Sequence, residues 1–333
     1  MEIEKIRVSI GSASVLGLDV SIKPKDPPTT CYLMTYIKGH CSANCSFCPQ
    51  ARESYSSTEK LSRVNWPVYP IEEVVKKLKL LPDEKSFKRI CIQTLNYPNN
   101  FIGVVEIVNK IREACECPIS VAIPPVSKER LKELKSIGVS RVGIALDGAT
   151  PEIFDRIKGS KVKGPYHWNE HVLCLRNALE IFKEGHVSTH LIVGLGETQE
   201  EILRKIMELH ELKITVSLFA FTPIKGTKLE KMIQPQLIDF RRIQLGRHLT
   251  INKSLSLKDF TFDVDGNLIK VNISKEKLRD IINNSNAFMT SGCPGCNRPY
   301  YTSRPSGPIY NYPRILSNNE KVEIFNQLEE YVN

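Results

Sequence analysis

The sequence predicts an α/β protein built on a β/α barrel, partial or full, with an N-terminal arm and a C-terminal extension. Apolar segments of strand length alternate with amphipathic segments of helical length between about residues 29 and 234. This alternation is typical of parallel sheets whose strand–helix crossovers close into a barrel. The 333 residues are enough for one such barrel, and 41% hydrophobic with 25% charged residues is an ordinary globular composition.

Three parts are expected along the chain. Residues 1–28 form the arm, because they hold no long periodic segment and Pro24, Pro27 and Pro28 end a short extended stretch. Residues 29–234 form the barrel core. Residues 235–333 form an extension in which the strand–helix rhythm is lost and a Cys-x-x-Cys pair occurs.

The elements follow from the hydrophobic periodicity and from capping residues. Strands are expected at residues 29–37, 89–94, 119–123, 141–146, 186–193 and 215–221. Helices are expected at residues 70–81, 103–114, 127–137, 168–183 and 198–211. The extension should contain a helix at 235–252, a hairpin at 260–271, and helices at 275–283 and 319–331.

Charge and cysteine content indicate the cellular setting. The N-terminus lacks a signal-peptide pattern, and no apolar run approaches the roughly 20 residues that span a bilayer. A cytoplasmic protein is therefore expected, in which ten cysteines favour metal binding over disulfides. The net charge of +9 favours acidic protein partners. Nucleic-acid binding is not expected, because the basic residues are spread over helix faces as on an ordinary solvated surface.

A cysteine-rich loop follows the first expected strand. Cys41, Cys45 and Cys48 are spaced so that one tight loop can bring them to a single metal centre. Thiolates are the ligands of iron–sulfur clusters, and three of them leave one iron of a 4Fe–4S cluster without a protein ligand. The alternatives are scattered core thiols or a zinc loop. Zinc would need a fourth Cys or His ligand, and His40 is too close to Cys41 in the chain to serve easily.

This spacing, with Phe47 just before the last cysteine, resembles the signature of the radical S-adenosylmethionine (SAM) superfamily. The resemblance implies that Cys41, Cys45 and Cys48 are the catalytic metal ligands and that SAM binds the open iron. Reductive cleavage of SAM would then give a 5′-deoxyadenosyl radical that abstracts hydrogen from an unactivated carbon. Phe47 is expected to lie against the adenine.

The carboxyl ends of the strands are where a barrel of this kind places its active site. The fifth strand ends in a turn with Gly194, Gly196 and Glu197, which resembles the SAM-contacting motif of the superfamily. The glycines would let the backbone approach the ligand, and Glu197 would begin the next helix. Asp147, at the end of the fourth strand, is expected to accept hydrogen bonds from ribose hydroxyls or, equally well, to cap the next helix. The second strand lacks the usual Gly-Gly-Glu.

Within the superfamily, residues 30 to 230 look like biotin synthase. Members of that family hold a second cluster, the sulfur donor, on three strand cysteines and an arginine. Cys91 matches the first of these cysteines, but the other two positions fall on Ser120 and Ser188. The sequence therefore departs from biotin synthase at two of the cysteine ligands of the sulfur-donor cluster.

The tail carries Cys293 and Cys296 instead, a pair that serves as a redox dithiol, half a zinc site or half a cluster site. Their arrangement resembles archaeal-type two-component lipoyl synthases. By that resemblance we expect a second, auxiliary 4Fe–4S cluster whose third thiolate is Cys31, with Cys91 as the competing candidate. Analogy adds a serine ligand, Ser303 or Ser306.

The resemblance implies sulfur insertion into an octanoyl chain on a lipoyl carrier protein. A sister radical SAM subunit and a ferredoxin- or flavodoxin-type electron donor are the expected partners. Two alternatives remain open. One is a radical SAM enzyme without sulfur insertion, such as a mutase or methylase, and the other is a non-catalytic scaffold for a sister subunit.

Overall fold

The computed structural model describes residues 3–253 and 255–333. Its centre is an eight-stranded sheet in the order β10-β9-β8-β7-β6-β2-β1-β5. Neighbouring strands from β2 to β10 run parallel, which confirms the predicted β/α class and gives a partial barrel. These parallel strands are β2 (Thr30–Thr35), β6 (Arg89–Gln93), β7 (Ile119–Ala122), β8 (Val139–Gly143), β9 (Val187–Val193) and β10 (Thr215–Ala220).

The N-terminal segment is part of this sheet rather than an arm packed on it, so this expectation was wrong. Strand β1 (Lys5–Val8) pairs antiparallel with β2 and with β5 (Val68–Pro70). Ile6 and Val8 are fully buried. A four-residue strand is too short for its alternation to stand out in the sequence. The short helix α1 (Ile10–Val15) follows, capped by Ser9.

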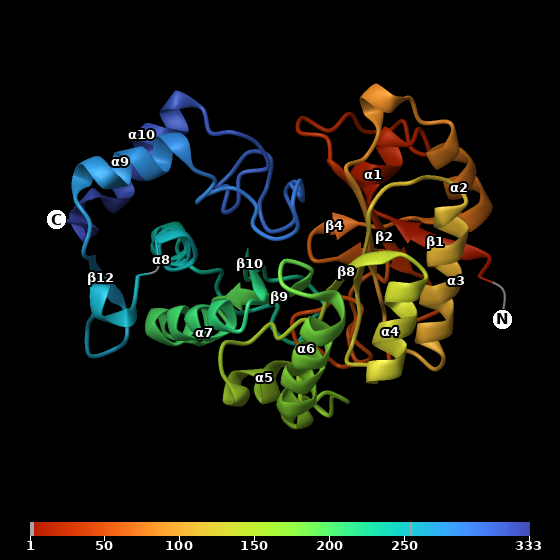
Figure 1. Ribbon diagram of the computed structural model, residues 1–333, viewed down its shortest axis with the longest axis horizontal. Coiled ribbons are helices and arrows are strands. Elements are labelled where there is room, and N and C mark those ends of the chain that lie inside the picture. Colours follow the sequence, from red (N-terminus) through yellow and green to blue (C-terminus); the bar gives the residue numbers. More distant parts are fainter. Residues whose placement is uncertain (1–2, 254) are drawn as a thin grey trace.

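Helices cover the outer face of the sheet (Figure 1). They are α2 (Ile71–Lys79), α3 (Asn100–Arg112), α4 (Lys128–Ser136), α6 (Trp168–Phe182) and α7 (Gln199–Glu211). All five lie where periodicity predicts helices, because apolar side chains at helical spacing cover the sheet, as Ile71, Val74 and Leu78 do in α2. The additional helix α5 (Pro151–Lys158) was not expected, although Thr150 caps it and proline begins it.

The C-terminal extension contains α8 (Leu237–Lys253), the hairpin β11 (Phe260–Phe262) and β12 (Leu268–Val271), α9 (Lys275–Asn284) and α10 (Asn318–Leu328). The elements predicted there are confirmed to within two or three residues at most of their ends. Smaller elements are the hairpin β3 (Lys60–Leu61) and β4 (Val64–Asn65), and the 3-10 turns η1 (Asp83–Lys85), η2 (Ser160–Val162), η3 (Leu257–Asp259) and η4 (Glu329–Tyr331). In the described part of the chain, no helix is both long enough and apolar enough to cross a bilayer.

The segment between α9 and α10 reaches back to the open edge of β10 (Figure 1). The Leu218 N–H of this edge strand donates to Ser291 Oγ (3.0 Å), and the Leu218 carbonyl accepts from Asn311 Nδ2 (3.0 Å). Arg247 Nε donates to the Val216 carbonyl (2.9 Å). Side chains from the extension thus satisfy backbone groups that an unpaired edge strand would leave free. They also bring the tail's cysteines to the sheet.

Candidate active site

The cysteine loop is folded back on itself at the carboxyl end of β2. The Cys41 N–H donates to the Gln50 carbonyl (2.9 Å) and the Cys48 N–H donates to the Cys45 carbonyl (3.0 Å). Gln50 Nε2 in turn donates to the Thr58 carbonyl at 2.5 Å. The three cysteines line one cavity of about 210 Å³. The structure therefore brings the three predicted ligands together in one place.

These three cysteines suit a cluster. Burial raises the pKa of each thiol, that of Cys45 to about 12. Bound iron would offset this cost by holding them as thiolates. The Asn96 N–H donates to Cys41 Sγ (3.1 Å), a contact that supports a ligand sulfur. Within residues 3–253 and 255–333, no three Cys, His, Asp or Glu side chains gather around a single ion. A cubane differs from such a site, because each thiolate binds its own iron.

Alanine at Cys41, Cys45 and Cys48 together is expected to remove about four irons per chain and to abolish 5′-deoxyadenosine formation from SAM. Iron analysis and chromatography of the SAM products measure both effects. Any auxiliary iron should remain, and far-ultraviolet circular dichroism should match the wild type. Reductive SAM cleavage by this variant would contradict the assignment of the loop.

Asp147 lines the cavity, and each of its two carboxylate oxygens contacts a basic side chain. Lys158 Nζ, from α5, lies 2.6 Å from one oxygen and His190 Nε2 lies 2.9 Å from the other. Burial works to raise the pKa of Asp147, but Lys158 and His190 outweigh it, and the pKa lies well below its usual range. Thr150 caps α5, so the alternative role of Asp147 as a helix cap was wrong. The ribose contact stays a prediction, and it would have to share a carboxylate that is already ion-paired.

Apolar side chains complete the wall. Phe47 lines the cavity and packs in a small cluster with Ile192 and Phe221. This is an apolar surface of the kind that an adenine ring contacts. The sequence singled out Phe47 but missed Lys158 and His190, because α5 was not predicted and His190 lies inside a strand.

The turn after β9 is packed closely against other parts of the chain, and its contact with SAM stays a prediction. A Cβ on Gly194 would lie 2.8 Å from Pro235 Cδ, and one on Gly196 would lie 2.4 Å from Arg156 Nη2. Glu197 accepts the N–H groups of Gly194 (2.6 Å) and Leu195 (3.0 Å), while Thr198 caps α7. Gly194, Gly196 and Glu197 do not line the cavity. A side chain at either glycine would therefore collide with protein atoms. Burial raises the pKa of Glu197 to about 7 in spite of its two hydrogen bonds.

A second group of cysteines forms on the inner face of the sheet. Tyr32, Cys91 and Ser120 are register partners across β2, β6 and β7, so their side chains share one face. Cys293 Sγ lies 3.8 Å from Ser120 Oγ, and Cys296 Sγ lies 3.1 Å from the Tyr32 hydroxyl. The tail thus places a thiol beside one of the two serines that stand where biotin synthases have cysteine.

Cys31 is not part of this group, so the expectation that it supplies the third thiolate is corrected. It pairs with Ile90 in the register next to Tyr32 and Cys91, which turns its side chain to the opposite face. There it is fully buried in the hydrophobic core under the helices. Cys91 and Cys296 belong to a separate cluster inside the barrel. The structure brings Cys91, Cys293 and Cys296 together instead.

The serine ligand expected by analogy is not brought to the cysteines either. Ser303 Oγ accepts the Tyr310 N–H (2.9 Å) and is buried within the tail's own fold. Ser306 is exposed. Within the described part of the chain, Ser303 forms no hydrogen bond with Cys293 or Cys296, and its oxygen instead holds the tail.

Arg298 is the residue that sequence reasoning missed at this second site. Its guanidinium carbon lies over the rings of Tyr32 (5.4 Å), Phe219 (5.2 Å) and Tyr301 (4.1 Å). Burial works to lower its pKa, but Tyr301, Cys91, Tyr32 and Cys296 outweigh this, and the pKa is raised. A buried cation beside thiols is suited to offset the negative charge of a thiolate-bound cluster.

A partial β/α barrel with this cysteine loop after its first parallel strand defines a protein that binds a 4Fe–4S cluster and SAM. The sequence profile of the Radical SAM superfamily matches residues 35–209, more than half of the chain. The chain therefore belongs to the radical SAM superfamily.

Its curated relatives are similar to it in part. The biotin synthase of Campylobacter hominis is 26% identical over 205 residues, which cover 60% of this chain and 59% of the relative. The biotin synthase of Methanocaldococcus jannaschii is 25% identical over 252 residues, which cover 64% of this chain and 66% of the relative. The chain thus spans about three fifths to two thirds of the length of these relatives.

A solved structure shares the fold. The X-ray structure of the FeFe-hydrogenase maturase HydG from Carboxydothermus hydrogenoformans superposes with a TM-score of 0.52 at 19% identity. The match covers 73% of this chain and 56% of that one. At this identity the likeness concerns the fold alone. The chain is thus a member of the radical SAM superfamily that is similar to biotin synthases over about three fifths of its length.

Proposed function

We propose that this protein is a radical SAM sulfurtransferase that inserts sulfur into an octanoyl chain on a lipoyl carrier protein. The observation that carries the proposal is the group formed by Cys91, Cys293 and Cys296. Sulfur insertion needs a donor, and the barrel lacks two of the cysteines that hold it in biotin synthases. The tail places the thiols of Cys293 and Cys296 beside Cys91, so that three thiolate ligands are available for a cluster.

The residues of the chain form two groups, one for the SAM-binding cluster and one for the auxiliary cluster. When bound, SAM and its cluster supply a one-electron cleavage that generates a hydrogen-abstracting radical. Cys41, Cys45 and Cys48 would hold that cluster, and the apolar wall around Phe47 would limit the access of water to it. Cys91, Cys293 and Cys296 would hold the auxiliary cluster, with Arg298 as its counter-charge. The Tyr32 hydroxyl accepts a hydrogen bond from the Arg298 backbone N–H (2.8 Å) and lies 3.1 Å from Cys296 Sγ, where it would donate to a thiolate.

The expected partners are part of the same proposal. A net charge of +9 suits an acidic carrier protein and an acidic ferredoxin- or flavodoxin-type electron donor. A sister radical SAM subunit is proposed from the resemblance to two-component lipoyl synthases.

The deciding experiment is the Cys293→Ala/Cys296→Ala double variant, assayed with an octanoylated carrier protein or an octanoyl-lysyl peptide. It should keep SAM cleavage, fall from about eight irons to about four, and form no thiolated product. Cys174→Ala is the matched control. Cys174 lies in α6 and is buried in the core between the sheet and the outer helices, so its replacement should change neither the iron content nor the product. Unchanged iron in the double variant, or a wild type that never thiolates these substrates with or without a sister subunit, would overturn the proposal.

A radical SAM enzyme without sulfur insertion, such as a mutase or methylase, is the second candidate. Ser120 and Ser188 favour it, because they stand where the sulfur-donor ligands of biotin synthases would be. In that case Cys293 and Cys296 would serve a structural metal, and the wild type would carry about four cluster irons rather than about eight.

A further inference from the structure

A second cavity of about 470 Å³ opens between the N-terminal segment, the β3–β4 hairpin and the tail. Its walls are largely apolar and aromatic, and include Ile10, Val64, Trp66, Tyr32 and Tyr301. No part of the mechanism proposed above uses it. It is distinct from the SAM cavity, which lies at the cysteine loop.

Two residues of this lining, Tyr32 and Arg298, separate the cavity from the inner group of cysteines, none of which lines it. Tyr32 and Arg298 line it, and the Tyr32 hydroxyl lies 3.1 Å from Cys296 Sγ. Arg298 and Tyr301 line both cavities and so stand between them. Ser62 Oγ, in the turn of the β3–β4 hairpin, donates to the Tyr301 carbonyl (2.9 Å). This hydrogen bond holds Tyr301 in place between the two cavities. The cavity therefore ends one side chain away from Cys296, on a side separate from the SAM cavity.

The lining carries an excess of positive charge. Lys23, Lys25, Arg63 and Arg298 line the cavity, and Asp26 is the carboxylate among its lining residues. Asp26 is already engaged by Tyr300 and by Arg314 (3.5 Å). In the part of the chain that the structure describes, Arg63 makes no ion pair.

Two buried donors in this lining find no acceptor among the residues that the structure describes. They are Trp66 Nε1 and Arg298 Nε, and Trp66 is only 1% exposed. Buried donors are normally paired, so an acceptor is expected to reach them. Unpaired donors in a cationic cavity point to an anion.

We propose that this cavity admits small anions to the auxiliary site, and that hydrosulfide is the anion it delivers. The inference rests on the proposed function, because sulfur insertion consumes sulfide that must be replaced before the next turnover. Hydrosulfide supplies sulfide and releases its proton to solvent. The incoming sulfur is at the same −2 level as the sulfide that was consumed, so refilling the vacant position needs no oxidant or reductant of its own.

Anion entry is tested first, on the protein without clusters. The chain has two tryptophans, so Trp168→Phe leaves Trp66 as the only one. Iodide should quench Trp66 fluorescence more strongly than caesium does, with neutral acrylamide as the reference. Adding Lys25→Glu and Arg63→Glu should lower the iodide quenching constant about two- to fivefold at low ionic strength and leave acrylamide quenching unchanged.

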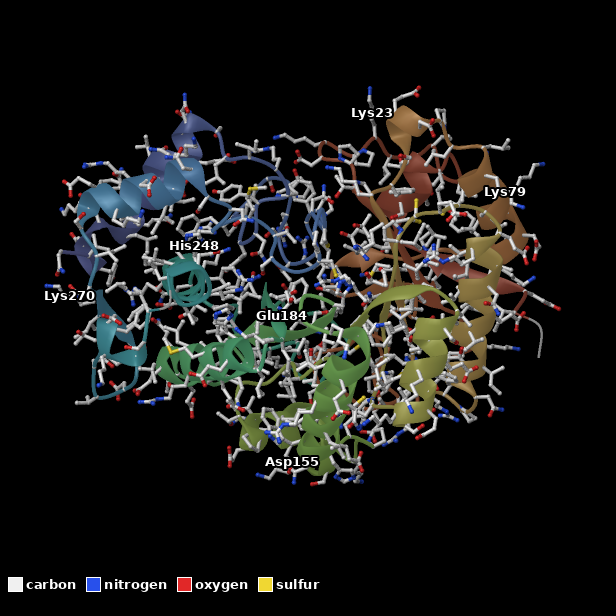
Figure 2. All side chains as sticks on the ribbon, viewed as in Figure 1. Lys23, Lys79, Asp155, Glu184, His248 and Lys270 are labelled. Carbon is white, nitrogen blue, oxygen red and sulfur yellow. The ribbon has the colours of Figure 1, made fainter. Side chains whose placement is uncertain are left out.

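The matched control reverses the same number of charges elsewhere. Lys258 and Lys270 are exposed in the C-terminal extension. Lys270 and Lys23 lie toward opposite ends of the molecule (Figure 2). Lys258→Glu/Lys270→Glu should therefore leave iodide quenching close to that of the parent. Equal loss of iodide quenching in both double variants, or no loss in either, would overturn anion entry through this cavity.

Sulfide delivery is tested with the Cys41→Ala/Cys45→Ala/Cys48→Ala chain, in which any remaining iron is auxiliary. Uptake of isotopically labelled sulfide into that iron should be slowed by Lys25→Glu/Arg63→Glu and unaffected by the control pair. Reduced quenching with unchanged label uptake would overturn the sulfide assignment. A chain that holds no auxiliary iron at all would instead count against the proposed function, while the quenching result still decides whether anions enter.

Discussion

Cys91→Ala is expected to remove the auxiliary cluster, whereas Cys31→Ala is expected to keep it. The two positions differ by one place in the register between β2 and β6, and that difference turns one side chain into the barrel and the other into the outer core. Iron and acid-labile sulfide should fall by about half in Cys91→Ala and stay at the wild-type level in Cys31→Ala.

The pair controls for stability as well as for position. Cys31 is fully buried, so its truncation costs packing energy and should lower the unfolding midpoint without loss of iron. Cys91 is less buried and its loss should act mainly through the cluster. If Cys31→Ala lost the auxiliary iron and Cys91→Ala retained it, the inner group of cysteines would be wrongly assigned.

Asp147→Asn is expected to destabilise the fold by about 3–5 kcal/mol, even without SAM. The substitution leaves the Lys158 ammonium without a carboxylate, and both side chains are only 5% exposed. Urea unfolding of the cluster-free protein measures the effect. Asp147→Asn/Lys158→Met should recover most of the loss, because it removes both charges together. A loss below about 1 kcal/mol would contradict a structural role for this pair.

The same pair predicts the direction of the pH dependence. The Asp147 pKa is lowered in the folded state, chiefly by Lys158 and His190 acting against burial. Its contribution to stability is therefore fully present above the unfolded pKa of about 3.9 and is lost as the pH falls toward the folded value. Acid unfolding of Asp147→Asn should accordingly depend less steeply on pH than that of the wild type. An unchanged slope would mean that the carboxylate is not ion-paired.

Local sequence patterns were enough to predict the main strands and helices of this protein and its first group of cysteine ligands. Hydrophobic periodicity predicted the six parallel strands and the helices between them, since each element buries one face against the sheet whatever its partners are. The spacing of Cys41, Cys45 and Cys48 predicted one metal centre, because three ligands on one short loop converge without help from distant residues.

Only the tertiary structure decided how distant segments meet. Which face Cys91 and Cys31 present depends on strand register, and the approach of Cys293 and Cys296 depends on how the tail covers the edge of β10. The roles of Gly194 and Gly196 depend on Pro235 and Arg156, which pack against them from elsewhere in the chain. These contacts join residues far apart in sequence, and no local propensity encodes them. The first cluster site is therefore encoded in a single loop, while the proposed second site depends on how β6, β7 and the tail come together.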